Sequence, residues 1–401
     1  MDFLPAHRLD SVKPSPSMAA KARVDALRAE GRSIIDFTIG EPDFPTPQHI
    51  VEAGIAALGA GHTRYTAATG TPALRRAIAD KLQRENSLSY GVDQIVVGIG
   101  AKHIIYNAFA ATLNEGDEVI IPTPFWVSYP DMVALNGGTP VIVGCDESSG
   151  FKLTAAALEK SITLRTRWLV LNTPNNPSGA VYTASELKAL CEVLMRHPQV
   201  WVMTDEIYEH FVYAGAQHVS PLQVQPELAG RTLVINGVSK AYAMTGWRIG
   251  YGAGPRPLMQ ALGLLMTQST TCAAGVSQAA AVAALSGSQQ CVAEGAALFA
   301  QRRERIVALV NAIDGMRCLA PDGAFYIFPS VQGLLGKSTP QGKTLASDVD
   351  VMMYFLEQAG VATIDGTSYG QPGYLRFSFA TSLEQIEQGC AQLAAAVAAL
   401  K

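Results

Sequence analysis

The sequence predicts an α/β protein, with a large domain built on a mostly parallel sheet flanked by helices and a smaller α+β domain. Helical patterns alternate with short β-branched runs between residues 48 and 287, which is typical of parallel strands joined by crossover helices. Near Ser288 the pattern changes to a long charged helix and then to mixed strands. A chain of 401 residues is too long for one compact core. We expect an N-terminal segment (1–47) that packs on the small domain, a large domain (48–287) and a small domain (288–401).

Short runs rich in β-branched and aromatic residues mark the expected strands in chain order. In the large domain these runs fall at 94–97, 118–121, 140–143, 168–171, 200–204 and 232–235. In the small domain, a helix over 291–313 precedes two strands at 324–328 and 374–379. A polar, glycine-rich stretch over 332–343 lies between those two strands, and the sequence leaves open whether it moves as a lid.

The composition favours a well-buried enzyme, because 48% of the residues are hydrophobic and only 16% are charged. The net charge of −4 gives no indication of binding to nucleic acid or to an anionic membrane, which would require a basic surface. We find neither a signal-like apolar core at the start nor an apolar run near the ~18 residues that a membrane span needs. We therefore expect a cytoplasmic protein. The scattered cysteines and histidines predict reduced thiols and no metal site.

Three successive strands of the predicted sheet end in polar clusters. Asn172 and Asn176 follow the strand at 168–171, Asp205 and Tyr208 follow the next strand, and Lys240 follows the third. In open α/β sheets, ligands bind beyond the carboxyl ends of the strands. These strands are thus expected to deliver an amide, a carboxylate with a phenol, and a lysine to one edge of the sheet.

Pyridoxal phosphate (PLP) is the cofactor whose chemistry requires these groups. A lysine that enters an apolar stretch, as Lys240 does, loses its proton more easily and can form a Schiff base with an aldehyde. Asp205 can hold the protonated pyridine nitrogen, which lets the ring take up carbanion charge. Asn176 and Tyr208 can donate to the phenolic oxygen, and Arg248 lies eight residues beyond the lysine, where it can bind the phosphate.

The run from Gly237 to Gly250, GVSKAYAMTGWRIG, resembles the lysine-attachment signature of class I aminotransferases, which have the PLP-dependent transferase fold of type I. The resemblance extends over nearly the whole chain and is strongest to the bacterial aspartate/prephenate aminotransferase subgroup. It implies transamination in two half-reactions, with Lys240 as the general base and ping-pong kinetics. Some family members carry a serine phosphate ligand where this chain has Gly237, so that contact must come from elsewhere.

The same resemblance implies roles for residues outside this run. Trp126 would stack on the pyridine ring, and Arg376 would grip the substrate α-carboxylate. Gly40 would belong to the loop that contacts the substrate. The turn that binds the phosphate would be formed by Gly100, Ala101 and Lys102. Tyr65 is placed where family members reach the phosphate of the neighbouring subunit, which implies a homodimer.

The sequence narrows the class of substrate but does not identify one substrate. Lys102 and Lys13 resemble basic residues with which the subgroup recognises the distal carboxylate of aspartate, and some members also accept prephenate. We expect an L-amino acid donor, aspartate or another dicarboxylate, and a 2-oxo acid acceptor such as 2-oxoglutarate. The alternatives are an aromatic or broad neutral aminotransferase and a PLP-dependent lyase of the same fold.

Overall fold

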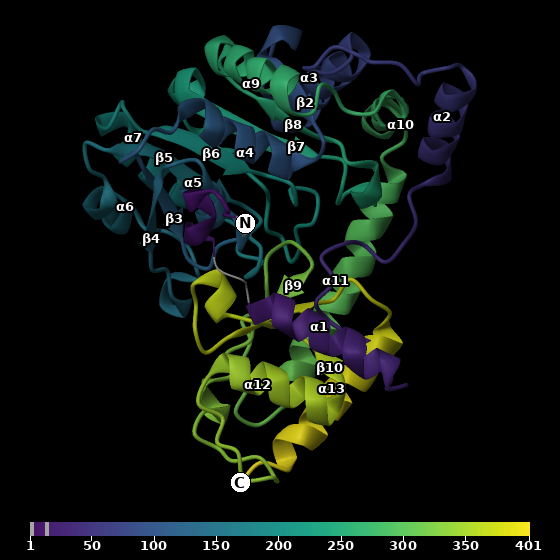
Figure 1. Cartoon of the computed structure of the whole chain (residues 1–401), viewed down its shortest axis with the longest axis vertical. Helices are drawn as coiled ribbons and strands as arrows, with labels where there is room; N and C mark the ends of the chain where they lie inside the picture. The colour runs from purple at the N-terminus through teal and green to yellow at the C-terminus, as the bar shows by residue number, and fades with distance from the viewer. Residues whose placement is uncertain (1–3, 13–15) are drawn as a thin grey trace.

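The computed structural model describes residues 4–12 and 16–401, which build a sheet-containing body and a smaller body linked by one long helix (Figure 1). The main sheet has seven strands in the order β2-β8-β7-β6-β5-β3-β4. In that order the strands are Ile95–Gly98, Gly250–Ala253, Thr232–Gly237, Trp201–Asp205, Thr166–Asn172, Glu118–Pro122 and Thr139–Val143. Only β8 runs antiparallel to its neighbours, so the predicted mostly parallel sheet is confirmed.

Strand β8 was not among the predicted strands, because its sequence, Gly-Tyr-Gly-Ala, lacks the β-branched pattern of the others. The structure explains these glycines by close packing. A β-carbon on Gly250 would collide with the backbone of Ala101, and one on Gly252 would lie 2.8 Å from Ile104. Glycine therefore lets the start of α4 approach the sheet.

Both faces of the main sheet are covered by helices. Alternate side chains of β5 point to opposite faces, with Leu169 and Leu171 in one core and Trp168 and Val170 in the other. The first core also receives α2 (Gln48–Gly59), α3 (Pro72–Asn86), α7 (Ala184–Arg196) and α10 (Gly275–Ser286). The second receives α4 (Ala101–Thr112), α5 (Ser128–Leu135) and α9 (Arg256–Ser269). The short helices α6 (Ala155–Ser161) and α8 (Pro221–Val224) complete this body.

Local signals fix the ends of several of these helices. Thr71 caps α3 by accepting a hydrogen bond from the backbone N–H of Leu74, and Pro72 occupies the first turn. Thr183 and Glu186 form a reciprocal capping box at the start of α7. These caps satisfy backbone donors that the helices leave free.

The long helix α11 (Gln290–Asn311) joins the two bodies (Figure 1). Val292, near its start, packs in the first core of the large sheet, whereas Phe299 and Ile306 pack in a separate core. Further helices and strands contribute to that separate core: α12 (Asp348–Tyr354), α13 (Leu383–Ala398), β1 (Ile35–Asp36), β9 (Tyr326–Ile327), β10 (Val361–Ala362) and β12 (Leu375–Ser378). Strand β11 (Ile364–Asp365) pairs with β12. The domain boundaries expected at 47 and 287 stay predictions.

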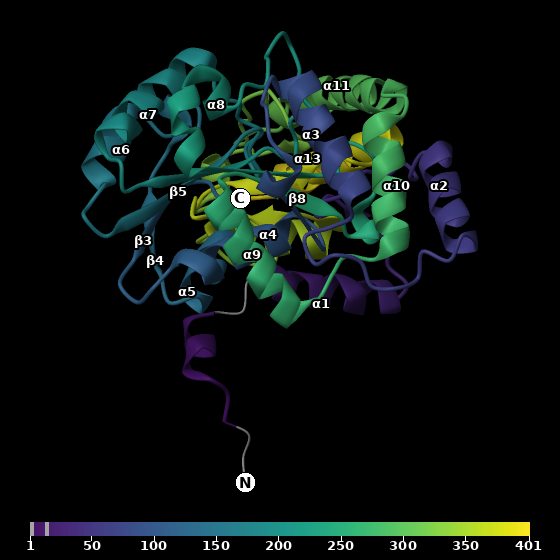
Figure 2. The ribbon, with the colours of Figure 1, turned by 90° about the horizontal axis from the view of Figure 1, so that it is seen from above.

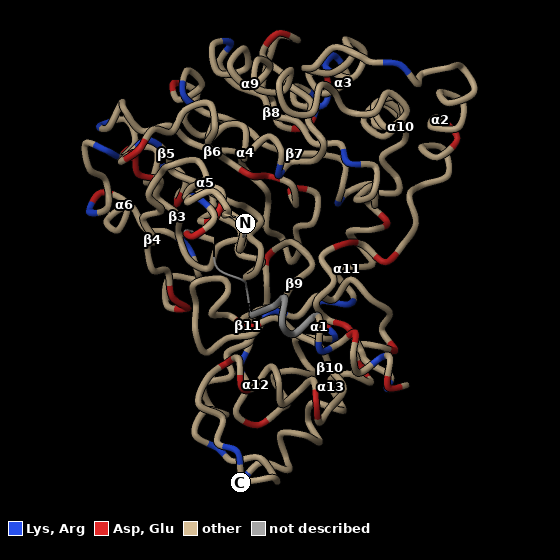
Figure 3. Tube along the Cα trace, in the orientation of Figure 1, with Lys and Arg blue, Asp and Glu red and all other residues tan. Residues whose placement is uncertain are grey.

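The N-terminal region contacts the smaller body. Val24 and Leu27 of α1 (Pro16–Ala29) pack on Leu356 and Ala362. Figure 2 shows the short 3-10 turn His7–Ser11 beside α5. Acidic and basic residues are interspersed along the trace (Figure 3). Among the described residues, no helix is long and apolar enough to cross a membrane.

Candidate active site

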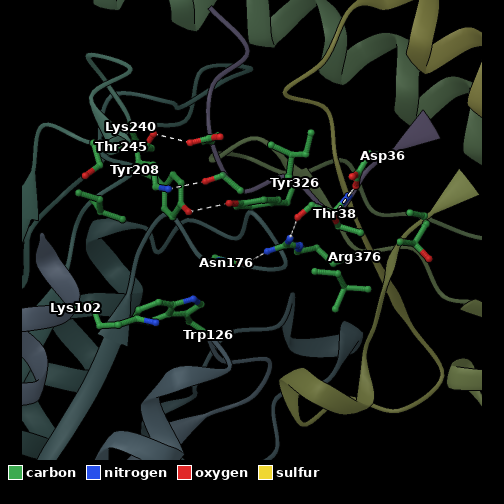
Figure 4. A pocket seen from close by; sticks show the side chains of 18 of the residues that line it. Asp36, Thr38, Lys102, Trp126, Asn176, Tyr208, Lys240, Thr245, Tyr326 and Arg376 are labelled. Atoms are coloured by element: carbon green, nitrogen blue, oxygen red, sulfur yellow. Dashed lines mark hydrogen bonds between the residues drawn. The ribbon is translucent and has the colours of Figure 1, made fainter. Parts of the chain in front are cut away.

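A cavity of about 750 Å³ lies beyond the carboxyl ends of β5, β6 and β7 and reaches into the smaller body. Both bodies line it, and many of the predicted site residues face it (Figure 4). Those residues are Gly40, Ala101, Lys102, Trp126, Asn176, Asp205, Tyr208, Lys240, Arg248 and Arg376. The polar strand ends therefore converge in space as the topology of a parallel sheet requires.

Lys240 lies in the segment after β7, where it is mostly enclosed. Its Nζ donates a hydrogen bond of 2.6 Å to the carbonyl of Gly40. Burial, assisted by the positive charge of Arg376, lowers the pKa of Lys240 to about 8. Roughly a tenth of this amine is thus uncharged at pH 7, far more than for a lysine of ordinary pKa, and the uncharged form is the nucleophile toward an aldehyde.

Asp205 ends β6 and is buried. Tyr129 of α5 donates a 2.7 Å hydrogen bond to its Oδ2, and the backbone N–H of Ile207 donates to Oδ1 at 3.3 Å. Burial raises the pKa of Asp205 to about 6, and the bond from Tyr129 opposes that rise. The carboxyl is therefore mainly ionised at neutral pH and can face a cationic ring nitrogen.

Arg376, on β12, forms the opposite wall of the cavity. Its Nη1 donates to Asn176 Oδ1 at 3.2 Å and its Nη2 to the carbonyl of Thr38 at 2.6 Å, while its Nε is buried without a partner. The guanidinium lies 4.5 Å from the centre of the Tyr326 ring. The Tyr326 hydroxyl is 2.9 Å from that of Tyr208. These contacts hold the guanidinium in place, with a donor free for an anion (Figure 4).

A second cationic region lies at the start of α4. Lys102 Nζ is 4.6 Å from the centre of the Trp126 ring, and burial together with Arg248 lowers the pKa of Lys102. Arg248 Nη1 donates to the carbonyl of Thr245 at 2.9 Å. Gly100 has a φ of +96°, and a β-carbon there would lie 2.5 Å from Arg248 Nη2. Glycine thus lets the Arg248 guanidinium approach the start of α4, and a guanidinium beside a helix N-terminus suits a phosphate.

Some predicted residues do not line this cavity. Tyr65 is 88% exposed, and neither Tyr65 nor Gly100 is among the residues that line the cavity. Lys13 falls outside the described residues. Residues 332–343 do not line the cavity either, and the backbone of Ser338 bonds to that of Lys401 instead.

Several contributors were not predicted. Tyr129, Tyr326 and Thr38 act through contacts between elements far apart in the chain, which no local pattern reveals. Ser239 and Thr245 also line the cavity, and the Thr245 hydroxyl donates to Glu41 Oε2 at 2.5 Å. A β-carbon on Gly237 would lie 2.9 Å from the carbonyl of Ile249, so this chain has no room for a serine there.

The comparisons with known proteins agree with this site. The sequence model of class I and II aminotransferases matches residues 32–393, and the chain belongs to this family. An aspartate aminotransferase of Rhizobium meliloti (strain 1021) is 50% identical over 98% of this chain and 96% of its own. An aspartate/prephenate aminotransferase of Cereibacter sphaeroides is 49% identical over 100% of both chains. The resemblance inferred from the motifs is thereby confirmed.

Solved structures show the same fold. The aspartate aminotransferase from Rhizobium meliloti superposes with a TM-score of 0.98 at 49% identity and covers 100% of both chains. The Thermus thermophilus aspartate aminotransferase with maleate gives a TM-score of 0.91 at 38% identity, covering 99% of this chain and 100% of that one. The predicted fold of type I is confirmed.

Proposed function

We propose that this aminotransferase uses PLP bonded to Lys240 and moves the amino group of L-aspartate to a 2-oxo acid such as 2-oxoglutarate. The observation that carries the proposal is the convergence of Lys240, Asp205 and Arg376 on one cavity of about 750 Å³. These three groups supply an amine for the aldehyde, an anion for the ring nitrogen and a cation for the substrate carboxylate.

The residues of the cavity fit this cofactor. Ala101, at the N-terminus of α4, and Arg248, which Gly100 allows to come close to that N-terminus, both line the cavity, and they would hold the phosphate. Trp126 offers an indole face to the ring, and Tyr208 offers a hydroxyl to the phenolic oxygen. When bound, PLP supplies an electron-withdrawing ring that stabilises negative charge at the substrate Cα.

The chain's own groups bind the substrate and move its proton. Arg376 is the partner that we assign to the α-carboxylate, because its buried Nε lacks a partner and its guanidinium can form a two-pronged contact. Lys240 Nζ is the base that we assign to the α-proton. Its pKa of about 8 allows the amine to accept a proton and to return it near neutral pH.

Lys102 supports a dicarboxylate as the substrate. Lys102 lines the cavity, and desolvation together with the positive charge of Arg248 lowers its pKa. A second substrate carboxylate would supply an anion to this cationic region. The related enzymes are named for aspartate, and the Thermus thermophilus structure holds maleate, which is a dicarboxylate. Lys13 stays a predicted second contact.

A homodimer is the assembly that we propose for activity. Tyr65 is 88% exposed and does not line the cavity of its own chain, so its predicted phosphate contact requires a second copy. Ile55, Leu58 and Leu264 are large apolar side chains that are more than half exposed, which is consistent with a surface covered by a partner. We also propose a cytoplasmic location.

The test is a substrate titration without a 2-oxo acid. The purified protein should show the visible band of lysine-bound PLP, and L-aspartate should convert it to the absorbance of pyridoxamine phosphate. Lys240→Ala should lack both the band and turnover. If L-phenylalanine converts the band at lower concentration than aspartate, the dicarboxylate assignment is wrong. Release of ammonia without pyridoxamine phosphate would indicate a lyase.

A further inference from the structure

Tyr129 contacts two residues of the site without having been assigned a role. Its hydroxyl donates to Asp205 Oδ2 at 2.7 Å, and its ring meets the edge of Trp126 with centroids 5.3 Å apart and planes at 84°. The exposed fraction of the Tyr129 side chain is 1% and that of Asp205 is 4%. Water therefore does not compete for this hydrogen bond, and the bond fixes the orientation of the carboxyl.

The charged and titratable groups around Asp205 show why this hydroxyl matters. Lys240 faces it from the segment after β7, and Glu206 and Tyr208 follow it in the chain. Burial raises the pKa of Asp205 to about 6, and the hydrogen bond from Tyr129 is the largest influence that lowers it. The positive charge of Lys240 has a smaller effect. The phenol thus stabilises the carboxylate more than the nearest cation does.

We propose that Tyr129 is a positioning residue that keeps Asp205 ionised and aimed at the ring nitrogen of bound PLP, while its ring sets the angle of the Trp126 indole. This inference rests on the proposed function. Oδ2 accepts from the hydroxyl, and Oδ1 accepts only the longer bond of 3.3 Å from the backbone N–H of Ile207, so Oδ1 retains a lone pair for the ring N–H.

Loss of this hydroxyl changes where one proton resides. In the native pair the ring nitrogen carries the proton and Asp205 is an anion. Without the bond from Tyr129 the anion loses its strongest neutral donor, so the shared proton moves from the ring nitrogen to the carboxylate. No proton leaves the pair. The ring then becomes neutral pyridine, which accepts negative charge from the substrate Cα less well.

The experiment is nuclear magnetic resonance of holoenzyme loaded with PLP that is 15N-labelled at the ring nitrogen. Tyr129→Phe is compared with the wild type and with Tyr354→Phe. Tyr354 is a matched control, since it is a buried tyrosine whose hydroxyl donates to the carbonyl of Ala396 at 2.8 Å, outside the cavity. At neutral pH the Tyr129→Phe signal should move from the pyridinium position toward that of neutral pyridine. The control should not move.

Two further readouts accompany this shift. Removal of the α-proton of aspartate should slow at least about tenfold in Tyr129→Phe. This is the change expected when the pKa of the ring nitrogen falls by about one unit. Its isotope effect with aspartate deuterated at Cα should rise. If Tyr129→Phe does not fold, 3-fluorotyrosine at position 129 keeps the ring volume and provides a more acidic donor. That variant should keep the ring nitrogen protonated.

The outcomes separate the two proposals. A wild-type 15N position in Tyr129→Phe refutes the role of Tyr129 and leaves the proposed function standing. An equal displacement in Tyr129→Phe and Tyr354→Phe also refutes it, because the effect would then be a general loss of stability. Absence of any visible cofactor band in the wild type refutes the proposed function itself.

Discussion

Replacing Lys102 by methionine removes the charge that we assign to the distal carboxylate and keeps an unbranched stem against Trp126. The Lys102 side chain is exposed at the cavity, where desolvation together with Arg248 lowers its pKa, and a substrate carboxylate that enters the cavity can contact its ammonium. A hydrogen bond to a charged group contributes about 1.5–3 kcal/mol. The kcat/KM for L-aspartate should therefore fall about 10- to 150-fold.

L-Phenylalanine is the control substrate, because it shares the α-carboxylate with aspartate and lacks the distal one. Stopped-flow measurement of the amino-acid half-reaction gives kcat/KM for both substrates in the wild type and in Lys102→Met. We expect less than a threefold change for phenylalanine (an estimate for a lost contact that this substrate does not make). If both substrates lose activity equally, Lys102 serves only the phosphate, and the argument for a dicarboxylate pocket is refuted.

Three other changes test separate parts of the protein, two in the site and one at a buried ion pair outside it. Arg376→Lys should lower kcat/KM about 10- to 150-fold for aspartate and phenylalanine alike, because it removes the two-pronged α-carboxylate contact. Gly100→Ala should weaken PLP binding in a fluorescence titration, whereas Gly61→Ala, which shares a positive φ but faces open space, should not. Glu209→Gln should lower the free energy of unfolding by about 3–5 kcal/mol in urea, since it leaves the buried Lys81 with only the longer ion pair to Glu85, at 3.4 Å. A cost under about 1 kcal/mol, as for an exposed ion pair, would contradict this.

The fold and the centre of the site could be predicted from local sequence, because the carboxyl ends of parallel strands meet at one edge of the sheet. Asp205 and Lys240 were predicted on this basis, and the structure brings both to the cavity. Strand β8 was missed because its glycines carry no side-chain pattern. Their role depends on the approach of α4, which is a property of packing.

Other parts of the site depend on contacts that only the folded chain creates. The Tyr129 hydroxyl reaches Asp205 across 76 positions, and Arg376 reaches Thr38 across 338. Contacts between residues so far apart in the chain are set by tertiary packing and not by the local secondary-structure propensity of each residue. The role that we propose for Tyr65 requires a second copy of the chain, so neither the sequence pattern nor a single chain tests it.

The central claim is that Lys240 holds PLP in a cavity that accepts aspartate, and a spectral titration tests it most directly. The purified protein, supplied with PLP, is mixed with L-aspartate in the absence of a 2-oxo acid while its visible absorption is recorded. The account predicts a visible band that Lys240→Ala lacks, and complete conversion to pyridoxamine phosphate at an aspartate concentration below that needed for phenylalanine or alanine. A protein that shows no band after PLP is added would contradict the account.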